Sequence, residues 1–175
     1  MNFSHLANKL RSKITRFSGI LSQDLDKTAQ RFIREAVYGI MASQSVMLTE
    51  IGRQLESRIP LKKIEERFSR QLIKVGIWDC LHQRILSLAS SRVKDRTLLV
   101  LDLSDVKKKY AEKMEYLAKV HDGSEGGEIV DGYWTNQVIA TEVGCNEITP
   151  LHISLYSQNS PDFISENDEI LAAIE

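Results

Sequence analysis

The sequence predicts an α+β protein with two parts, an all-helical domain over residues 1–95 and a strand-containing domain over residues 96–175. In the first part apolar residues recur at intervals of three and four, which is the spacing of amphipathic helices. In the second part, short runs rich in β-branched and aromatic residues are typical of strands. The charge changes at the same boundary, from a net +9 over residues 1–96 to a net −10 over the rest.

Two long helices are expected at the start of the basic part. One apolar stripe runs from Leu6 to Leu21, and a more regular one runs from Leu25 to Met41. Ser22 is the expected N-cap of the second helix, with Asp24 and Asp26 in its first turn.

The next stretch has the pattern of a helix-turn-helix motif. A short helix over Leu48–Leu55 is followed by a turn and by a second helix over Leu61–Leu72. Gly52 is small where the two helices would cross. Pro60 can begin the second helix, because its missing N–H costs nothing there. A further helix over Trp78–Leu88 is expected to close the basic part.

The second helix of this motif carries cations away from its apolar stripe. Five of them are candidates for contacts with DNA phosphates: Lys62, Lys63, Arg67, Arg70 and Lys74. A basic domain suits a polyanion such as double-stranded DNA. The alternative is a solvated face, because Glu65 and Glu66 stand among these cations and can pair with them within the helix.

The acidic part is expected to contain strands at residues 97–103, 132–143 and 147–157, the last two joined as a hairpin by the turn GCN. The first run is apolar on both faces, as in a central strand. A short helical excursion is expected over residues 106–120 and a surface loop over 121–132, since the glycines there lack the spacing of a phosphate-binding loop. Ser165 is the expected N-cap of a final helix.

Composition indicates a cytoplasmic protein without a membrane partner. Cys80 and Cys145 are isolated and have no metal-binding spacing, which favours a reducing compartment. No apolar run reaches the roughly 18 residues of a membrane span. The polar, basic start of the chain lacks the apolar segment of a signal peptide.

Three segments together resemble the DDE transposases of bacterial insertion sequences: RFIREAVYGI, LVLDLSDVKKKYAEKMEYLAKVHDGSEGGEIVDGYW and LHISLYSQNSPDFISENDEI. The resemblance implies that residues 96–175 form an incomplete ribonuclease-H-like core, with three antiparallel strands and the start of a helix. It also implies that the basic part binds the DNA ends of the element. The chain is therefore expected to be the N-terminal portion of such a transposase.

The same resemblance implies a role for Asp102. In that family the first catalytic carboxylate stands on the first strand and is a ligand of Mg²⁺, in a centre where two metal ions promote attack on a phosphodiester. Asp105 is the competing assignment, although it fits a turn position better. The second Asp and the Glu of the family are absent from this chain, so we expect it to bind Mg²⁺ weakly and to be catalytically incomplete.

Two other functions fit the same residues. The chain can be a stand-alone helix-turn-helix DNA-binding protein without catalysis, or an inactive remnant or interaction protein. In the family a fourth strand covers the first one, so residues 98–103 are expected to leave an apolar sheet edge unpaired here. Such an edge is a template for self-association.

Overall fold

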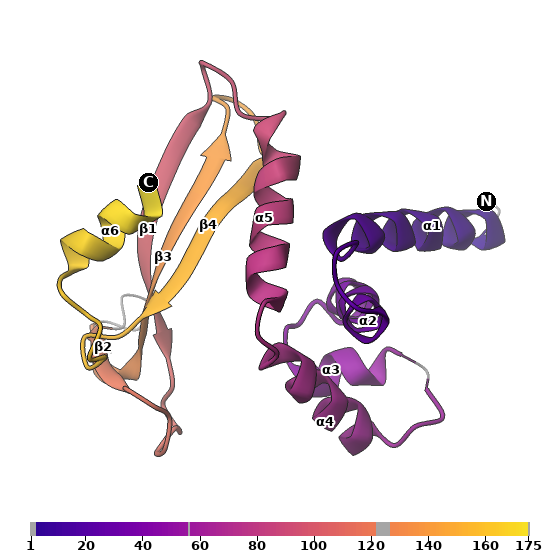
Figure 1. Ribbon diagram of the computed structural model, residues 1–175, viewed down its shortest axis with the longest axis horizontal. Coiled ribbons are helices and arrows are strands. Elements are labelled where there is room, and N and C mark those ends of the chain that lie inside the picture. Colours follow the sequence, from indigo (N-terminus) through magenta and orange to yellow (C-terminus); the bar gives the residue numbers. More distant parts are fainter. Residues whose placement is uncertain (1–2, 56, 122–126, 175) are drawn as a thin grey trace. The chain divides into compact units, whose positions relative to one another are not determined.

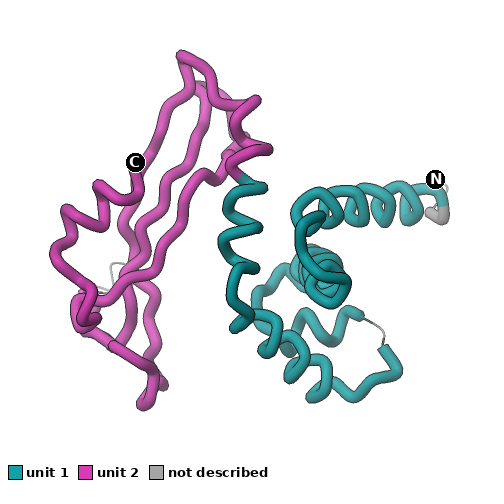
Figure 2. Tube along the Cα trace, in the orientation of Figure 1, with its two compact units in different colours: residues 1–85 teal, residues 86–175 magenta. Residues whose placement is uncertain are grey.

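The computed structural model describes residues 3–55, 57–121 and 127–174, and it confirms the α+β class. The chain forms two compact units, residues 1–85 and residues 86–175 (Figure 2). The first holds helices and the second holds an antiparallel sheet with one helix beside it (Figure 1). No described helix is both long enough and apolar enough to pass through a bilayer.

The helices of the first unit form where the apolar spacing predicts them. They are α1 (Phe3–Leu21), α2 (Lys27–Ser43), α3 (Leu48–Arg53), α4 (Leu61–Leu72) and α5 (Ile77–Ser90), which continues into the second unit. Eight side chains form the core of this unit: Leu21, Ala29, Phe32, Ile33, Ile51, Ile64, Phe68 and Ile77. Within it the rings of Phe32 and Phe68 meet edge to face, with centroids 5.1 Å apart.

The predicted N-cap of α2 is wrong. Asp26 caps this helix, because its Oδ1 accepts hydrogen bonds from the N–H groups of Thr28 at 2.9 Å and Ala29 at 3.0 Å. The Ser22 hydroxyl instead donates to the carbonyl of Ser18 at 2.6 Å. Ser22 therefore belongs to the end of α1, and a turn separates it from α2.

The sheet of the second unit is built around one long strand. Its four described strands are β1 (Leu98–Lys107), β2 (Ala118–His121), β3 (Ile129–Thr141) and β4 (Ile148–Tyr156), and β3 pairs antiparallel with each of the others. Helix α6 (Glu166–Ile174) contacts β3 and β4. The side-chain amide of the fully buried Asn136 donates to the carbonyl of Glu169 at 2.8 Å, which holds α6 against the sheet.

Several predictions for this unit hold and others are wrong. The hairpin of β3 and β4 is confirmed, and so is Ser165 as the cap of α6, since its hydroxyl accepts the N–H of Asp168 at 3.2 Å. The helical excursion over residues 106–120 is wrong. There β1 continues to Lys107, and β2 begins at Ala118 with alternating buried and exposed residues. Part of the expected loop, residues 122–126, lies outside the described residues.

The interpretation of the first strand as central is also wrong. β1 pairs with β3 along its length, and no described strand pairs with its other side. Leu98, Leu99 and Val100 are exposed, as the expected apolar edge requires.

A side chain at position 39 is expected to disrupt the packing of α2 against α3, whereas a side chain at position 19 is not. A Cβ at Gly39 would lie 2.5 Å from Cγ2 and 3.0 Å from the carbonyl oxygen of Ile51, while a Cβ at Gly19 meets nothing within 4 Å. Gly39→Ala should lower the free energy of unfolding by about 1–3 kcal/mol through overpacking. Gly19→Ala should raise it by up to about 1 kcal/mol through helix propensity. Urea unfolding followed by circular dichroism compares the two, and equal effects of either sign would contradict this packing.

Candidate nucleic-acid interface and the Asp102 position

The α3–α4 pair is held at close range by a glycine, as predicted. A Cβ at Gly52 would lie 2.7 Å from Cδ1 of Leu61 and 3.4 Å from Cγ2 of Ile64. Pro60 stands at the N-cap of α4, and its carbonyl accepts the N–H of Lys63 at 2.9 Å. Because Ile64 and Phe68 are buried in the core, the opposite face of α4 meets solvent.

Three of the predicted DNA-binding residues lie on that solvent face. Lys62, Lys63 and Arg70 are exposed. Nζ of Lys63 lies 3.0 Å from Oε2 of Glu66, and Nη2 of Arg70 lies 3.7 Å from the same oxygen. Among the described residues no acidic side chain pairs with Lys62. Exposed pairs within one helix contribute only a few tenths of a kcal/mol, so a phosphate can replace Glu66 at little cost.

The structure places Arg67 differently, against α2. Its Nη1 lies 2.7 Å from Oε2 of Glu35, and only 25% of its side chain is exposed. The other oxygen of Glu35 accepts a hydrogen bond from Nε of Arg31 at 2.7 Å. The Arg67 guanidinium also lies over the ring of Phe68, 5.2 Å from its centroid. Arg67 thus joins α4 to α2 through a partly shielded carboxylate.

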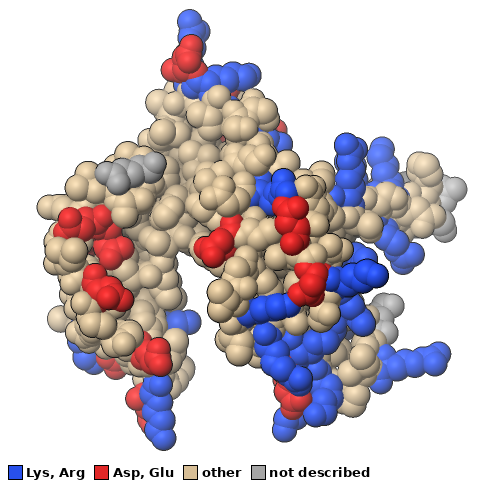
Figure 3. Space-filling model, in the orientation of Figure 1, with Lys and Arg blue, Asp and Glu red and all other residues tan. Residues whose placement is uncertain are grey.

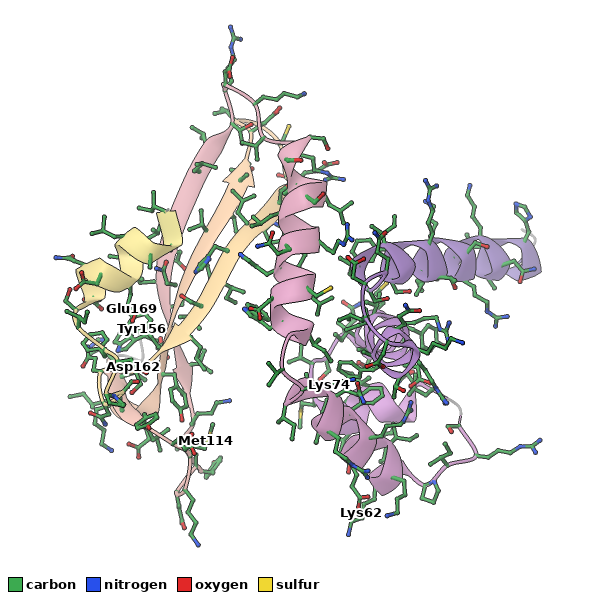
Figure 4. All side chains as sticks on the ribbon, viewed as in Figure 1. Lys62, Lys74, Met114, Tyr156, Asp162 and Glu169 are labelled. Carbon is green, nitrogen blue, oxygen red and sulfur yellow. The ribbon has the colours of Figure 1, made fainter. Side chains whose placement is uncertain are left out.

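Lys74 has a similar connecting role just beyond the end of α4. Lys62 and Lys74 stand at opposite ends of this helix (Figure 4). The ammonium of Lys74 donates to Oδ2 of Asp26, the residue that caps α2. This hydrogen bond, together with those from the N–H groups of Ala29 and Thr28, lowers the pKa of Asp26 to about 2.

Sequence reasoning missed the cations of α1, which has the largest excess of basic over acidic residues among the helices of this unit. The helix has four exposed cations and no acidic residue over its 19 residues: Lys9, Arg11, Lys13 and Arg16. None of the four forms an ion pair with an acidic residue in the described part of the chain. Lys and Arg gather over the helices of the first unit (Figure 3). The signal available in the sequence was that residues 3–21 include four Lys or Arg residues and no Asp or Glu.

Asp102 lies in the middle of β1, opposite Gln137 of β3. It is exposed, whereas a central strand that is apolar on both faces, as expected over residues 97–103, would have buried it. Its Oδ2 accepts a hydrogen bond from the hydroxyl of Ser104 at 2.7 Å. Asp105, opposite Trp134, points to the other face of the strand because the two positions differ by an odd number of residues.

The surroundings of Asp102 do not fit a two-metal centre. Such a centre needs several carboxylates that bridge or flank the two ions, whereas the side-chain hydrogen bond described for Asp102 joins it to a hydroxyl, that of Ser104. In the described ranges no group of three His, Cys, Asp or Glu side chains lies close enough together to hold a metal ion.

The Lys74–Asp26 pair makes a prediction about acid stability. Because the pKa of Asp26 in the folded protein lies below its ordinary value of 3.8, the stabilisation is present above about pH 4 and is lost as the pH falls toward 2. Lys74→Met should raise the pKa of Asp26 and lower stability at about pH 6 more than at about pH 2.5. Carboxyl NMR titration and urea unfolding measure both effects. Lys62→Met is the control, and an unchanged Asp26 titration in Lys74→Met would refute the contact.

No family model and no curated protein matches this chain. The likeness to DDE transposases therefore rests on the three segments quoted above.

Proposed function

We propose that this chain binds double-stranded DNA through its first unit, as the N-terminal portion of a DDE transposase of an insertion sequence, and that it lacks catalysis of its own. The observation that supports this most is the set of exposed cations on α1 without acidic partners in the described residues. Lys9, Lys13 and Arg16 follow one another at intervals of four and three residues, so they share one face of this helix, where they can attract the phosphates of DNA and displace its condensed counterions.

Helix α1 is long enough to follow a stretch of duplex. Its 19 residues extend about 28 Å, which corresponds to roughly eight base pairs at 3.4 Å each. Lys62, Lys63 and Arg70 on α4 add a second group of exposed cations. Contacts of this kind position a protein on DNA without reading its sequence. In this proposal Arg67 and Lys74 act indirectly, because they connect α4 to α2.

The arrangement of the second unit supports the transposase interpretation. A long first strand with Asp102 at its centre pairs with β3, β3 pairs with β4, and a helix follows against the same sheet. This is the order that the resemblance implies for the beginning of a ribonuclease-H-like core. Mg²⁺ would be the metal of the complete family site, and Asp102 would be the one residue of this chain to contact it.

The stand-alone DNA-binding protein is the second candidate. It would bind DNA through the same surface of the first unit. It differs from the first proposal only in that Asp102 would not correspond to the catalytic carboxylate of a transposase. In the described residues no group of three His, Cys, Asp or Glu side chains could hold a metal ion, which favours this alternative over an active nuclease.

DNA binding should depend on the exposed cations and should weaken with salt. Lys9→Ala with Lys13→Ala, and separately Lys62→Ala with Lys63→Ala, should reduce affinity for a duplex. Each should also flatten the plot of log K against log salt by about one unit for every phosphate that the protein no longer neutralises. Fluorescence anisotropy between about 50 and 200 mM salt measures this slope. Lys113→Ala with Lys119→Ala in the second unit is the matched control, and an equal loss of affinity there, or no binding by the wild type, would overturn the proposal.

Catalysis should be absent where binding is present. The purified chain should retard a supercoiled plasmid at low salt without nicking it in Mg²⁺ or Mn²⁺, because a single carboxylate does not hold two ions. Asp102→Asn should bind DNA as the wild type does, since this side chain lies outside the basic unit. Metal-dependent nicking by the wild type and not by Asp102→Asn would show that the site is complete after all.

A further inference from the structure

The free edge of β1 has a defined set of backbone groups. The N–H of Lys108 donates to the carbonyl of Asp131 at 2.6 Å, and the carbonyl of Ser104 accepts the hydroxyl of Thr135 at 3.0 Å. Both are even-numbered residues, and both turn their backbone groups toward β3. In a regular strand successive residues alternate in direction, and the register of β1 with β3 has no interruption. The odd-numbered residues from Leu99 to Lys107 therefore direct their N–H and C=O groups away from β3.

This edge is long and apolar at its start. Ten residues of β1 extend about 33 Å. Leu99 is 61% exposed, and its neighbours Leu98 and Val100 are 48% and 41% exposed. Native proteins normally cover or blunt such an edge, because it pairs readily with another strand. An extended backbone, whose N–H and C=O groups pair with those of the edge, is the chemistry that completes it.

We propose that the partner is a second copy of this chain, which adds its own β1 antiparallel to the first across a two-fold axis, with Leu103 opposite Leu103 of the second copy. A two-fold contact of this kind pairs the outward backbone groups of both β1 strands with each other. It leaves neither β1 edge free for a third copy, so the assembly ends at a dimer. The proposal is independent of the DNA-binding function, because it uses only the second unit.

The register follows from the direction of the backbone N–H and C=O groups and from the positions of the carboxylates in β1. Outward-facing residues must pair with outward-facing residues, which restricts an antiparallel partner to registers where the two numbers add to an even sum. A register centred on Asp102 or on Asp105 sets two carboxylates directly opposite each other, which is destabilising.

The register centred on Leu103 avoids this repulsion. It places Leu101 opposite Asp105 and Leu99 opposite Lys107, so nearly the whole of β1 is paired. Centring on Leu101 or on Ser104 also separates the carboxylates but pairs a shorter part of the strand.

Disulfide trapping tests the register. In a background with Cys80→Ser and Cys145→Ser, Leu103→Cys should form a covalent dimer under mild oxidation, because directly opposite Cα atoms lie about 5.5 Å apart. Leu99→Cys is the control. In this register the two copies of residue 99 are eight positions apart, roughly 27 Å. Crosslinking of Leu99→Cys as fast as Leu103→Cys would indicate parallel stacking or aggregation and would overturn the proposal.

Two neighbouring proline substitutions test the edge itself. Leu99→Pro removes an outward N–H and should raise the dimer dissociation constant roughly tenfold or more in sedimentation while the sheet persists. Leu98→Pro removes an N–H that faces β3, so it should weaken the end of the β1–β3 ladder and leave the dimer largely intact. Circular dichroism checks the fold of both variants. A wild-type chain that sediments as a monomer at high concentration, or equal effects of the two prolines on the dimer, would refute the proposal.

Discussion

The close approach of three helices at two glycines determines the shape of the first unit. Gly39 of α2 admits the side chain and carbonyl of Ile51, and Gly52 of α3 admits Leu61 of α4. With no Cβ at either position, α3 lies close to both of its neighbours, and Ile64 and Phe68 reach the core. The face of α4 that remains in solvent is a consequence of this packing. The placement of Lys62, Lys63 and Arg70 therefore depends on two residues that carry no side chain.

In the second unit the corresponding constraint is the pairing of β3 with every other strand. Gly132 stands where β1 and β2 both register with β3, and a Cβ there would lie 2.5 Å from the carbonyl oxygen of Val106. Along β3 the buried Asn136 holds α6 through Glu169. β1 and β4 pair with the same stretch of β3 from its two opposite sides, so β1 has one neighbour among the described strands and is left at the margin of the sheet.

Sequence periodicity predicted the helices and the β3–β4 hairpin because each is a local pattern that tertiary packing reinforces. It failed where the pattern is short or ambiguous. Ser22 and Asp26 are both good caps, and only the hydrogen bonds of Asp26 to the first turn of α2 distinguish them. Over residues 106–120 a short helix was expected, but Ala118 and Val120 alternate with exposed residues as in a strand. The strand that carries Asp102 was expected to be central, because an apolar run does not reveal whether its strand is at an edge.

The cations of α4 show which features of a side chain can be predicted from helical spacing and which cannot. Arg67 follows the buried Ile64 by three residues and directly precedes the buried Phe68. Helical spacing alone therefore places it at the margin of the core. Its partner Glu35 is remote in sequence, and only the packing of α2 against α4 brings the two together. Lys74 likewise reaches Asp26 across 48 residues. A cation on a basic helix is thus readily available to a phosphate where the fold leaves it exposed and does not tie it to a carboxylate of another helix. The cations of α1 meet this criterion without any acidic partner in the described residues, so α1 is a stronger candidate for DNA contact than α4.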